Sequence, residues 1–244
     1  MSDNSGTGLP ASIEAAWGMR SRPGPGPKPG LTLERIVEAA VQLASTDGIA
    51  AVSMVRIAKE LGVSTMALYR YVAAKDELVE LMMDAGIGLP PTRQDDAEWR
   101  ESLSRWARDY LAVLRQRPWL LQIPITGPPI MPNQIAWLEC GMARLRHTRL
   151  TEKDKLSVIM LLSGFVRNWA SLTASMRQAG DQRANLRYGS ALSKLIDDRR
   201  FPAVRAAITA GAIDDDQDDA DAEFAFGLDR ILDGIDVLTR QSPA

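Results

Sequence analysis

The chain has 244 residues, of which 45% are hydrophobic and 25% are charged, so it can bury a sizeable core and is not globally disordered. Its single cysteine, Cys140, excludes an internal disulfide framework. We identify no secretory signal and no membrane span, and we therefore expect a cytoplasmic protein. Residues 17–75 carry eight Lys and Arg against four Asp and Glu, which is typical of a segment that binds a polyanion, although a chance fluctuation in surface charge would look the same.

Residues 1–30 are predicted to form a flexible basic arm. Residues 1–16 are small, polar and Gly-rich, and the following Pro-rich backbone is extended because proline fixes φ and removes a backbone donor. The arm carries Arg20, Arg22 and Lys28. Such an arm can lie in an A·T-rich minor groove, and the alternative is a tail with weak, nonspecific attraction to DNA.

From residue 32 onward the apolar residues recur with helical spacing, and no alternating strand pattern bounded by turns occurs. We therefore expect an all-α fold. Glycines and prolines between residues 86 and 91 mark the end of a first unit, and seven acidic residues within 209–223 indicate a solvated loop. The predicted helices span 32–46, 54–61, 65–71, a segment from about 75, 96–116, a short piece after 118, 133–147, 151–178, 190–199, 202–210 and 221–240.

Residues 52–72 predict a helix-turn-helix. Two short helices flank the tight turn Gly62-Val63-Ser64, and the small side chain of Ala58 lies where the helices must approach each other. The second helix leaves two tyrosines and an arginine for its outer face, and a helix of this kind can enter the major groove of DNA. The alternative is an ordinary helix pair inside a core, which those polar side chains argue against.

The segment 31–85 resembles the DNA-binding domain of the tetracycline-repressor (TetR) family. The match rests on Ser53, Ile57-Ala58 and the runs 61–64, 68–72 and 75–78. Residues 117–119, 127–129 and 226–229 resemble, more loosely, the ligand-binding domain of the tetracycline-repressor branch. The resemblance implies a three-helix DNA-binding domain at 31–75, a helical ligand-binding and dimerisation domain at 76–244 with a linking helix at its start, and an Ω-shaped dimer.

Base-reading residues are expected at the start of the second helix, where Thr65, Met66 and Ala67 stand, and the last two suit thymine methyl groups. Tyr69 and Tyr71 resemble the family's phosphate contacts. The complete predicted DNA-binding set is Arg20, Arg22, Lys28, Ser53, Arg56, Ser64, Thr65, Met66, Ala67, Tyr69, Arg70, Tyr71 and Lys75.

Two positions in this set carry qualifications. Ser53 either only caps its helix or also binds a phosphate. The tetracycline repressors carry a base-reading arginine followed by a lysine early in this helix. The positions that resemble these two in this chain are Val55 and Arg56, so the tetracycline operator is not the expected target. Arg56 remains a candidate for a phosphate or base contact.

Large apolar residues from several predicted helices, with a few polar partners, are typical of a drug-sized site, although aromatic residues can equally fill a core. The predicted ligand-binding set is Trp119, Thr126, Trp137, Phe165, Asn168, Trp169, Leu172 and Met176. Tetracycline repressors hold a metal–drug chelate through a histidine, but the chain has only His147, and Ile123 stands at the position that resembles the chelating one. We expect no metal and no cofactor, and a hydrophobic or aromatic ligand.

The last predicted helix carries an apolar stripe that is either a dimer interface, as the resemblance implies, or intramolecular core. Its members follow one another at steps of 4, 3, 4 and 3: Phe224, Leu228, Ile231, Ile235 and Leu238.

The function expected is a ligand-responsive repressor that binds a palindromic operator as a homodimer and is released by a small hydrophobic or aromatic inducer. A ligand-independent DNA-binding regulator or activator is the alternative. An enzyme is not expected, because one histidine and a cysteine without a flanking cation provide neither a nucleophile–base pair nor a zinc site.

Overall fold

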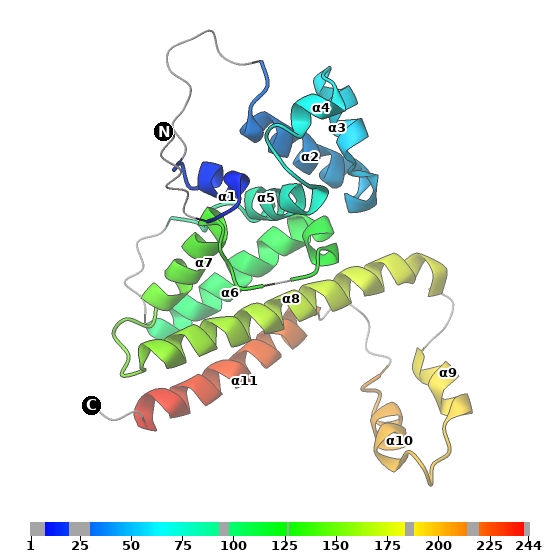
Figure 1. The fold of residues 1–244 in the computed structure, drawn as a ribbon. Helices are drawn as coiled ribbons and strands as arrows, with labels where there is room; N and C mark the ends of the chain where they lie inside the picture. Colours follow the sequence, from blue (N-terminus) through cyan, green and yellow to red (C-terminus); the bar gives the residue numbers. More distant parts are fainter. Residues whose placement is uncertain are drawn as a thin grey trace.

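The computed structural model describes residues 8–19, 30–92, 98–125, 127–183, 188–213 and 220–241. Within these residues the regular elements are α-helices and two short 3-10 helices (Figure 1), so the predicted all-α class is confirmed. The predicted site residues Arg20, Arg22, Lys28 and Thr126 lie outside the described residues.

The N-terminal unit consists of α2 (Leu33–Asp47), η1 (Ile49–Ala51), α3 (Met54–Leu61) and α4 (Thr65–Leu68). α2 begins where the side chain of Thr32 accepts a hydrogen bond from the backbone N–H of Arg35, and it ends at Gly48, whose φ of 82° suits glycine. The apolar faces of these helices close one small core, in which Ile36, Ile57 and Leu68 are completely buried.

A short helix precedes this unit, where the sequence predicts an unstructured arm. α1 (Ala11–Ala16) packs against α5 (Lys75–Ile87), and Ile13 is buried. The indole N–H of Trp17 donates to the carbonyl of Ile130 at 2.9 Å. The prediction is therefore wrong for residues 11–16, because contacts with distant parts of the chain stabilise a helix too short to be stable alone.

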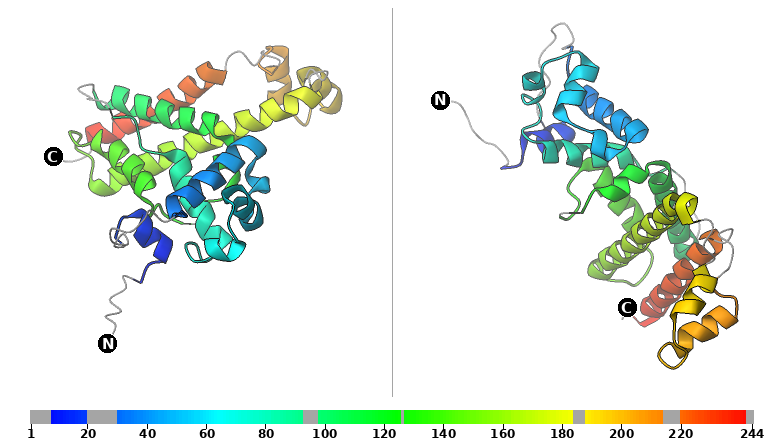
Figure 2. Two further views of the ribbon diagram at one scale, coloured as in Figure 1. Left: turned by 90° about the horizontal axis from the view of Figure 1, so that it is seen from above. Right: turned by 90° about the vertical axis from the view of Figure 1, so that its right-hand side faces the viewer.

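The C-terminal unit consists of α6 (Trp99–Gln116), η2 (Pro118–Gln122), α7 (Pro132–Ala143), α8 (Glu152–Arg183), α9 (Tyr188–Leu195), α10 (Pro202–Thr209) and α11 (Ala220–Gln241). α8 is the central helix and packs against α6, α7, η2 and α11. Figure 2 shows an elongated molecule, with the N-terminal unit at one end and the α9–α10 pair at the other.

α8 contains a stretch, Glu152–Met176, that is long and apolar enough to cross a membrane by length and composition alone. In this fold the stretch lies among other helices, and Ile159, Leu162 and Val166 are buried against them. Only 33% of this window is buried, and Leu161 and Leu172 remain exposed, so packing within the chain accounts for only part of its apolar character.

α5 lies between the two units and packs against both. It contacts α2 on one side and α7 and η2 on the other (Figure 1). Any change in the position of α5 relative to the C-terminal unit therefore moves the N-terminal unit as well.

Candidate DNA interface and ligand cavity

The turn between α3 and α4 is fixed by a glycine in the left-handed region. Gly62 has φ 67° and ψ 31°, and the next backbone N–H, of Val63, donates to the carbonyl of Ala58 at 2.9 Å. α4 begins after Ser64, whose hydroxyl oxygen accepts from the N–H of Ala67 at 3.3 Å. Its regular part is shorter than the predicted 65–71, because residues 69–71 continue as a turn.

One face of α4 is buried and the opposite face is open. Leu68 and, just beyond the helix, Val72 are completely buried, and this anchors the segment. Met66 is 73% exposed and Tyr69 46% exposed, while Arg70 is also exposed. The outer face of α4 therefore presents an apolar side chain, a phenol and a cation to the outside, as the sequence predicts.

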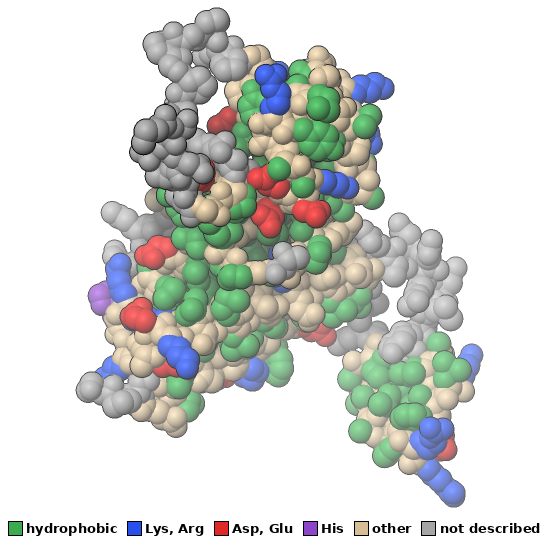
Figure 3. Space-filling view, viewed as in Figure 1, with side chains coloured by type: hydrophobic (Ala, Val, Ile, Leu, Met, Phe, Trp, Pro, Cys, Tyr) green, Lys and Arg blue, Asp and Glu red, His purple; other side chains and the backbone are tan. Residues whose placement is uncertain are grey.

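The remaining predicted contacts surround this face. Thr65 and Ala67 are half-buried at the start of α4, and Lys75 is exposed at the first residue of α5. On the face drawn in Figure 3, Lys and Arg side chains stand on the N-terminal unit, and acidic side chains gather just below it. This distribution places positive charge at the end of the molecule that carries α4.

Ser53 and Ser64 are both helix caps. The hydroxyl oxygen of Ser53 accepts from the backbone N–H of Arg56 at 3.3 Å, as that of Ser64 does from Ala67. Each oxygen uses a lone pair in the cap, so each hydroxyl proton can still be donated to a phosphate. The Arg56 guanidinium forms an exposed ion pair with Asp47, and DNA contact by Arg56 would have to compete with this carboxylate.

Tyr71 differs from Tyr69. Its hydroxyl donates to the backbone carbonyl of Leu31 at 2.9 Å and the side chain is half-buried, so it connects the segment before α2 to the turn that follows α4. A phosphate only accepts hydrogen bonds, so the predicted phosphate contact of Tyr71 would require this bond to be exchanged.

The C-terminal half of α5 is held to α7 by a buried carboxylate. Asp84 accepts from the backbone N–H of Gln134 at 2.9 Å, and its carbonyl accepts from the side-chain amide of Asn133 at 3.0 Å. Burial raises the pKa of Asp84 above its ordinary value, while hydrogen bonds from the backbone N–H groups of Gln134 and Asn133 to the carboxyl act in the opposite direction. Asp84 therefore supplies, from a neighbouring helix, an acceptor for a free N–H at the start of α7.

Two tryptophans join the C-terminal unit to α5 and α2. The indole N–H of Trp137 donates to the carbonyl of Gly88, just after α5, at 2.9 Å. The indole N–H of Trp119 donates to the hydroxyl of Ser45 on α2 at 3.2 Å. The ring of Trp119 also lies so close to Gly86 that a Cβ there would be 2.6 Å from it.

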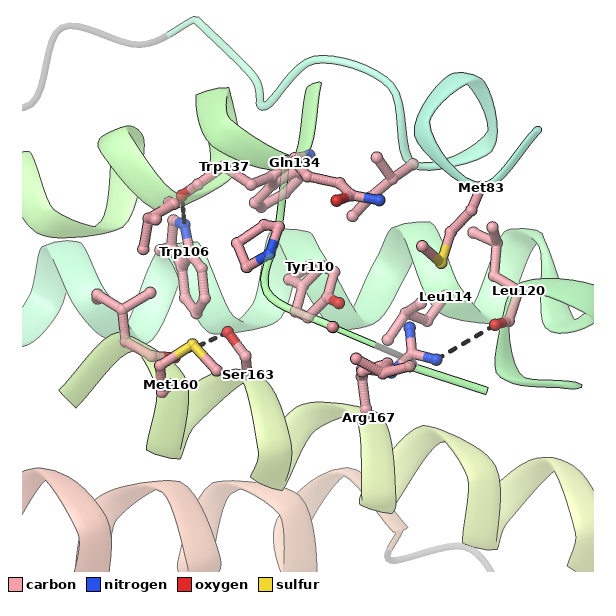
Figure 4. Close-up of a pocket in the computed structure, with 16 residues that line it drawn as sticks. Met83, Trp106, Tyr110, Leu114, Leu120, Gln134, Trp137, Met160, Ser163 and Arg167 are labelled. Carbon is pink, nitrogen blue, oxygen red and sulfur yellow. Dashed lines mark hydrogen bonds between the residues drawn. The ribbon is translucent and has the colours of Figure 1, made fainter. Parts of the chain in front are cut away.

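A cavity opens between α5 and the C-terminal unit. Its volume is about 150 Å³, smaller than the roughly 300–1,000 Å³ of drug-sized sites, so a ligand of that size must extend through the open mouth or move the walls apart. Trp106, Tyr110 and Trp137 form one wall, with ring centroids 5.3–6.0 Å apart. Figure 4 shows further side chains that surround the space, including Met83, Leu114, Leu120, Gln134, Met160, Ser163 and Arg167.

Comparisons with known proteins agree with this architecture. Residues 36–82 match the family model described as bacterial regulatory proteins, tetR family, and residues 90–239 match the tetracyclin repressor-like C-terminal domain. The chain belongs to the TetR family. It is a transcriptional regulator with a helix-turn-helix.

Two proteins from Streptomyces are similar to this chain over most of its length. The HTH-type transcriptional repressor DrrR1 of Streptomyces coeruleorubidus is 37% identical over 98% of this chain and 90% of its own length. The structure of ActR from Streptomyces coelicolor in complex with actinorhodin has a TM-score of 0.72 at 27% identity, over 86% of this chain and 98% of ActR. The complex of ActR with (S)-DNPA has a TM-score of 0.70 at 29% identity, over 84% of this chain and 97% of ActR.

The predicted ligand-binding residues of this TetR-family chain that the structure describes fall in four places. Trp137 lines the cavity, whereas Trp119 lies at the contact with α2 and α5. Phe165 instead stacks on Phe224 of α11 with ring centroids 5.3 Å apart, and Trp169 is tilted against the same ring at 6.3 Å. The other three predicted side chains of α8 are exposed and do not line the cavity: Asn168, Leu172 and Met176.

The cavity residues on α8 were missed because the helix is apolar on more than one face. Met160, Ser163 and Arg167 follow one another at steps of 3 and 4 and face the cavity, while Phe165 and Trp169 face α11. The arginine within an otherwise apolar stretch was a signal in the sequence, because a lone cation there needs a polar partner.

The stripe predicted on the last helix divides in a similar way. Phe224, Leu228 and Ile235 are at most 4% exposed within one protomer, because α11 packs against α6 and α8. These three side chains are intramolecular core, and a dimer interface formed by them is not supported. Ile231 is half-buried and Leu238 is 37% exposed, so these two retain surface for a partner.

In the parts of the chain that the structure describes, His, Cys, Asp and Glu form no group of three or more that could hold a metal ion. His147 lies at the surface, where the Arg146 side chain donates to its ring at 2.9 Å, and Ile123 is buried.

Proposed function

We propose that the chain is a ligand-responsive repressor, which binds a palindromic operator as a dimer and leaves it when a small aromatic compound occupies the cavity. One observation carries the proposal: α5 begins at Lys75, shortly after α4 and its following turn, and then supplies Met83 and Ile87 to the cavity wall. A single helix thus contacts the ligand space at one end and adjoins the DNA-binding face at the other.

On the DNA side, we assign base contacts to Thr65, Met66 and Ala67, and phosphate contacts to Tyr69 and Lys75. The exposure of Met66 and Tyr69 supports this assignment, since an apolar side chain can meet a thymine methyl group and a phenol can donate to a phosphate. Ser53 and Ser64 add hydroxyl protons beside their caps.

For the dimer, we assign the interface to exposed apolar side chains on α8 and α11. Leu161, Leu172 and Met176 on α8, and Val237 and Leu238 on α11, are between 37% and 55% exposed. Contact between two copies would remove this apolar surface from water, and a dimer would present two α4 segments to successive major grooves.

The mechanism follows from the contacts of α5. A ligand between α5 and the wall of Trp106, Tyr110 and Trp137 would change the position of α5, and α5 would carry α4 with it. Recognition helices displaced by a few ångströms cannot enter two major grooves together, so the ligand only needs to prefer the displaced state. The structures of ActR in complex with actinorhodin and with (S)-DNPA support a small-molecule ligand in this architecture.

The experiment uses a gel shift with DNA from upstream of the chain's own gene, followed by addition of polycyclic aromatic compounds. We expect retarded DNA with two protomers per site, and its release by compounds that raise the thermal stability of the protein. DNA binding unaffected by every compound that binds would favour the ligand-independent regulator. Turnover of a bound compound by the pure protein would instead indicate that the chain is an enzyme.

A further inference from the structure

We infer that the compound which fits this cavity is an aromatic acid, and that its anionic group is bound by Arg167. The inference deepens the proposed function and rests on it. It also implies that the acid draws Arg167 away from η2, the segment that carries the contact with α2.

The charge of the cavity wall is unbalanced. Of the described residues that line the cavity, Arg167 alone is charged; no Asp or Glu is among them. The guanidinium also has no carboxylate within 4.0 Å anywhere in the described ranges. A half-buried cation without an anion is a site that an anionic ligand can complete.

The present partners of Arg167 are weak and neutral. Its Nη2 atom donates to the carbonyls of Leu120 at 3.3 Å and Ile123 at 3.5 Å. Both distances exceed the usual 2.7–3.2 Å range for N–H···O bonds, whereas a carboxylate would accept shorter, charge-assisted bonds. Figure 4 shows the guanidinium directed from α8 toward Leu120 along the cavity. A carboxylate would therefore compete well for this donor.

The rest of the wall favours a flat aromatic body. Trp106, Tyr110 and Trp137 provide ring faces, while Met83 and Leu114 provide apolar surface. The hydroxyl of Tyr110 forms no hydrogen bond with any residue that the structure describes, so it can bind a ligand oxygen. An aromatic amine would instead place its positive charge beside Arg167.

Arg167 also connects the cavity to the DNA-binding unit. The carbonyl of Leu120 follows directly after Trp119, whose indole N–H donates to Ser45 on α2. If Arg167 turns to a carboxylate, the carbonyls of Leu120 in η2 and of Ile123 just after it lose the Arg167 donor while Trp119 is still attached to α2. The acid would thus loosen the contact at which the two units meet.

The test compares two probes of the same shape, anthracene-2-carboxylate and anthracene-2-carboxamide, by calorimetry on the full-length protein. In the native protein we expect the carboxylate to bind about tenfold more tightly than the carboxamide, a difference of about 1.4 kcal/mol. Arg167→Gln should weaken the carboxylate by about the same factor and change the carboxamide by less than about threefold. Arg199→Gln removes an exposed arginine between α9 and α10 and should leave both affinities unchanged.

The outcomes separate this inference from the proposed function. If both probes bind the native protein equally well, or if Arg167→Gln keeps the preference for the acid, the inference is overturned and the aromatic cavity stands. If neither probe binds, both the inference and the proposed function with an aromatic ligand are contradicted. If Arg167→Gln does not fold, Arg167→Lys replaces it, because lysine keeps the positive charge. This variant must still bind the carboxylate more tightly than the carboxamide, and equal binding of the two probes overturns the inference.

Discussion

Alanine at position 86 tests the contact between α5 and η2. A Cβ on Gly86 would lie 2.6 and 2.8 Å from two ring carbons of Trp119 and 3.0 Å from a methyl carbon of Leu120. Carbon atoms in contact are about 3.5–4.0 Å apart, so the overlap with the ring is about 1 Å. Trp119 is only 3% exposed and is bonded to Ser45, so the ring has little space into which it can move.

The expected loss of stability combines two opposing effects. Overpacking of a core costs about 1–3 kcal/mol, and alanine gains roughly 0.5–1 kcal/mol over glycine inside a helix. Gly86→Ala should therefore lower the free energy of unfolding by about 1–2 kcal/mol. Urea denaturation followed by circular dichroism measures this, at one fixed protein concentration because the proposed dimer would contribute to stability.

The Trp119→Leu background provides the control. Without the indole ring, alanine at position 86 should be neutral or stabilising by up to about 1 kcal/mol, so the two substitutions should be strongly non-additive. Stabilisation of the native protein by Gly86→Ala, or the same cost in both backgrounds, would refute the contact.

Three further predictions concern single side chains. Tyr69→Phe and Lys75→Ala should weaken DNA binding at every sequence, and Lys75→Ala should lower the slope of log K against log salt by about one unit; an unchanged slope would remove Lys75 from the interface. Tyr71→Phe should cost about 0.5–1.5 kcal/mol in urea through loss of the bond to Leu31 and leave that slope unchanged, whereas a changed slope would restore its predicted phosphate contact. Asp84→Ala should cost about 1–2 kcal/mol because Gln134 N–H loses its acceptor, and Asp84→Asn should not. Because burial raises the pKa of Asp84, the folded chain holds the proton more tightly than the unfolded chain, so native stability should fall as pH rises from 3.8 through the raised pKa. The stability of Asp84→Asn should not fall over this pH range, and equal stability–pH profiles for the native protein and this variant would contradict the prediction.

The parts of the fold that local chemistry controls were predictable from the sequence. α3 begins after the Ser53 cap and ends at Gly62, as predicted, because a cap and a left-handed glycine act within one turn of the helix. The exposed face of α4 was predictable for the same reason, since the tight turn fixes which residues point outward. α1 was not, because its stability depends on Ile13 and on a bond from Trp17 to the distant Ile130.

The ligand cavity was less predictable than the DNA interface. Residue type identifies Trp119, Trp137 and Phe165 as interior aromatic side chains, but only the packing of several helices decides which of them faces an open space. The same holds for α11, where one stripe contains both core residues such as Leu228 and partly exposed ones such as Leu238.

The most direct test of the coupling between cavity and DNA is a reciprocal titration with one aromatic compound that calorimetry shows to bind. The DNA affinity is measured with and without saturating compound, and the affinity for the compound is measured for free and DNA-bound protein. We predict that both affinities fall by the same factor, about 5–150-fold, because linkage between two sites is reciprocal. A compound that binds fully and leaves the DNA affinity unchanged would contradict the account.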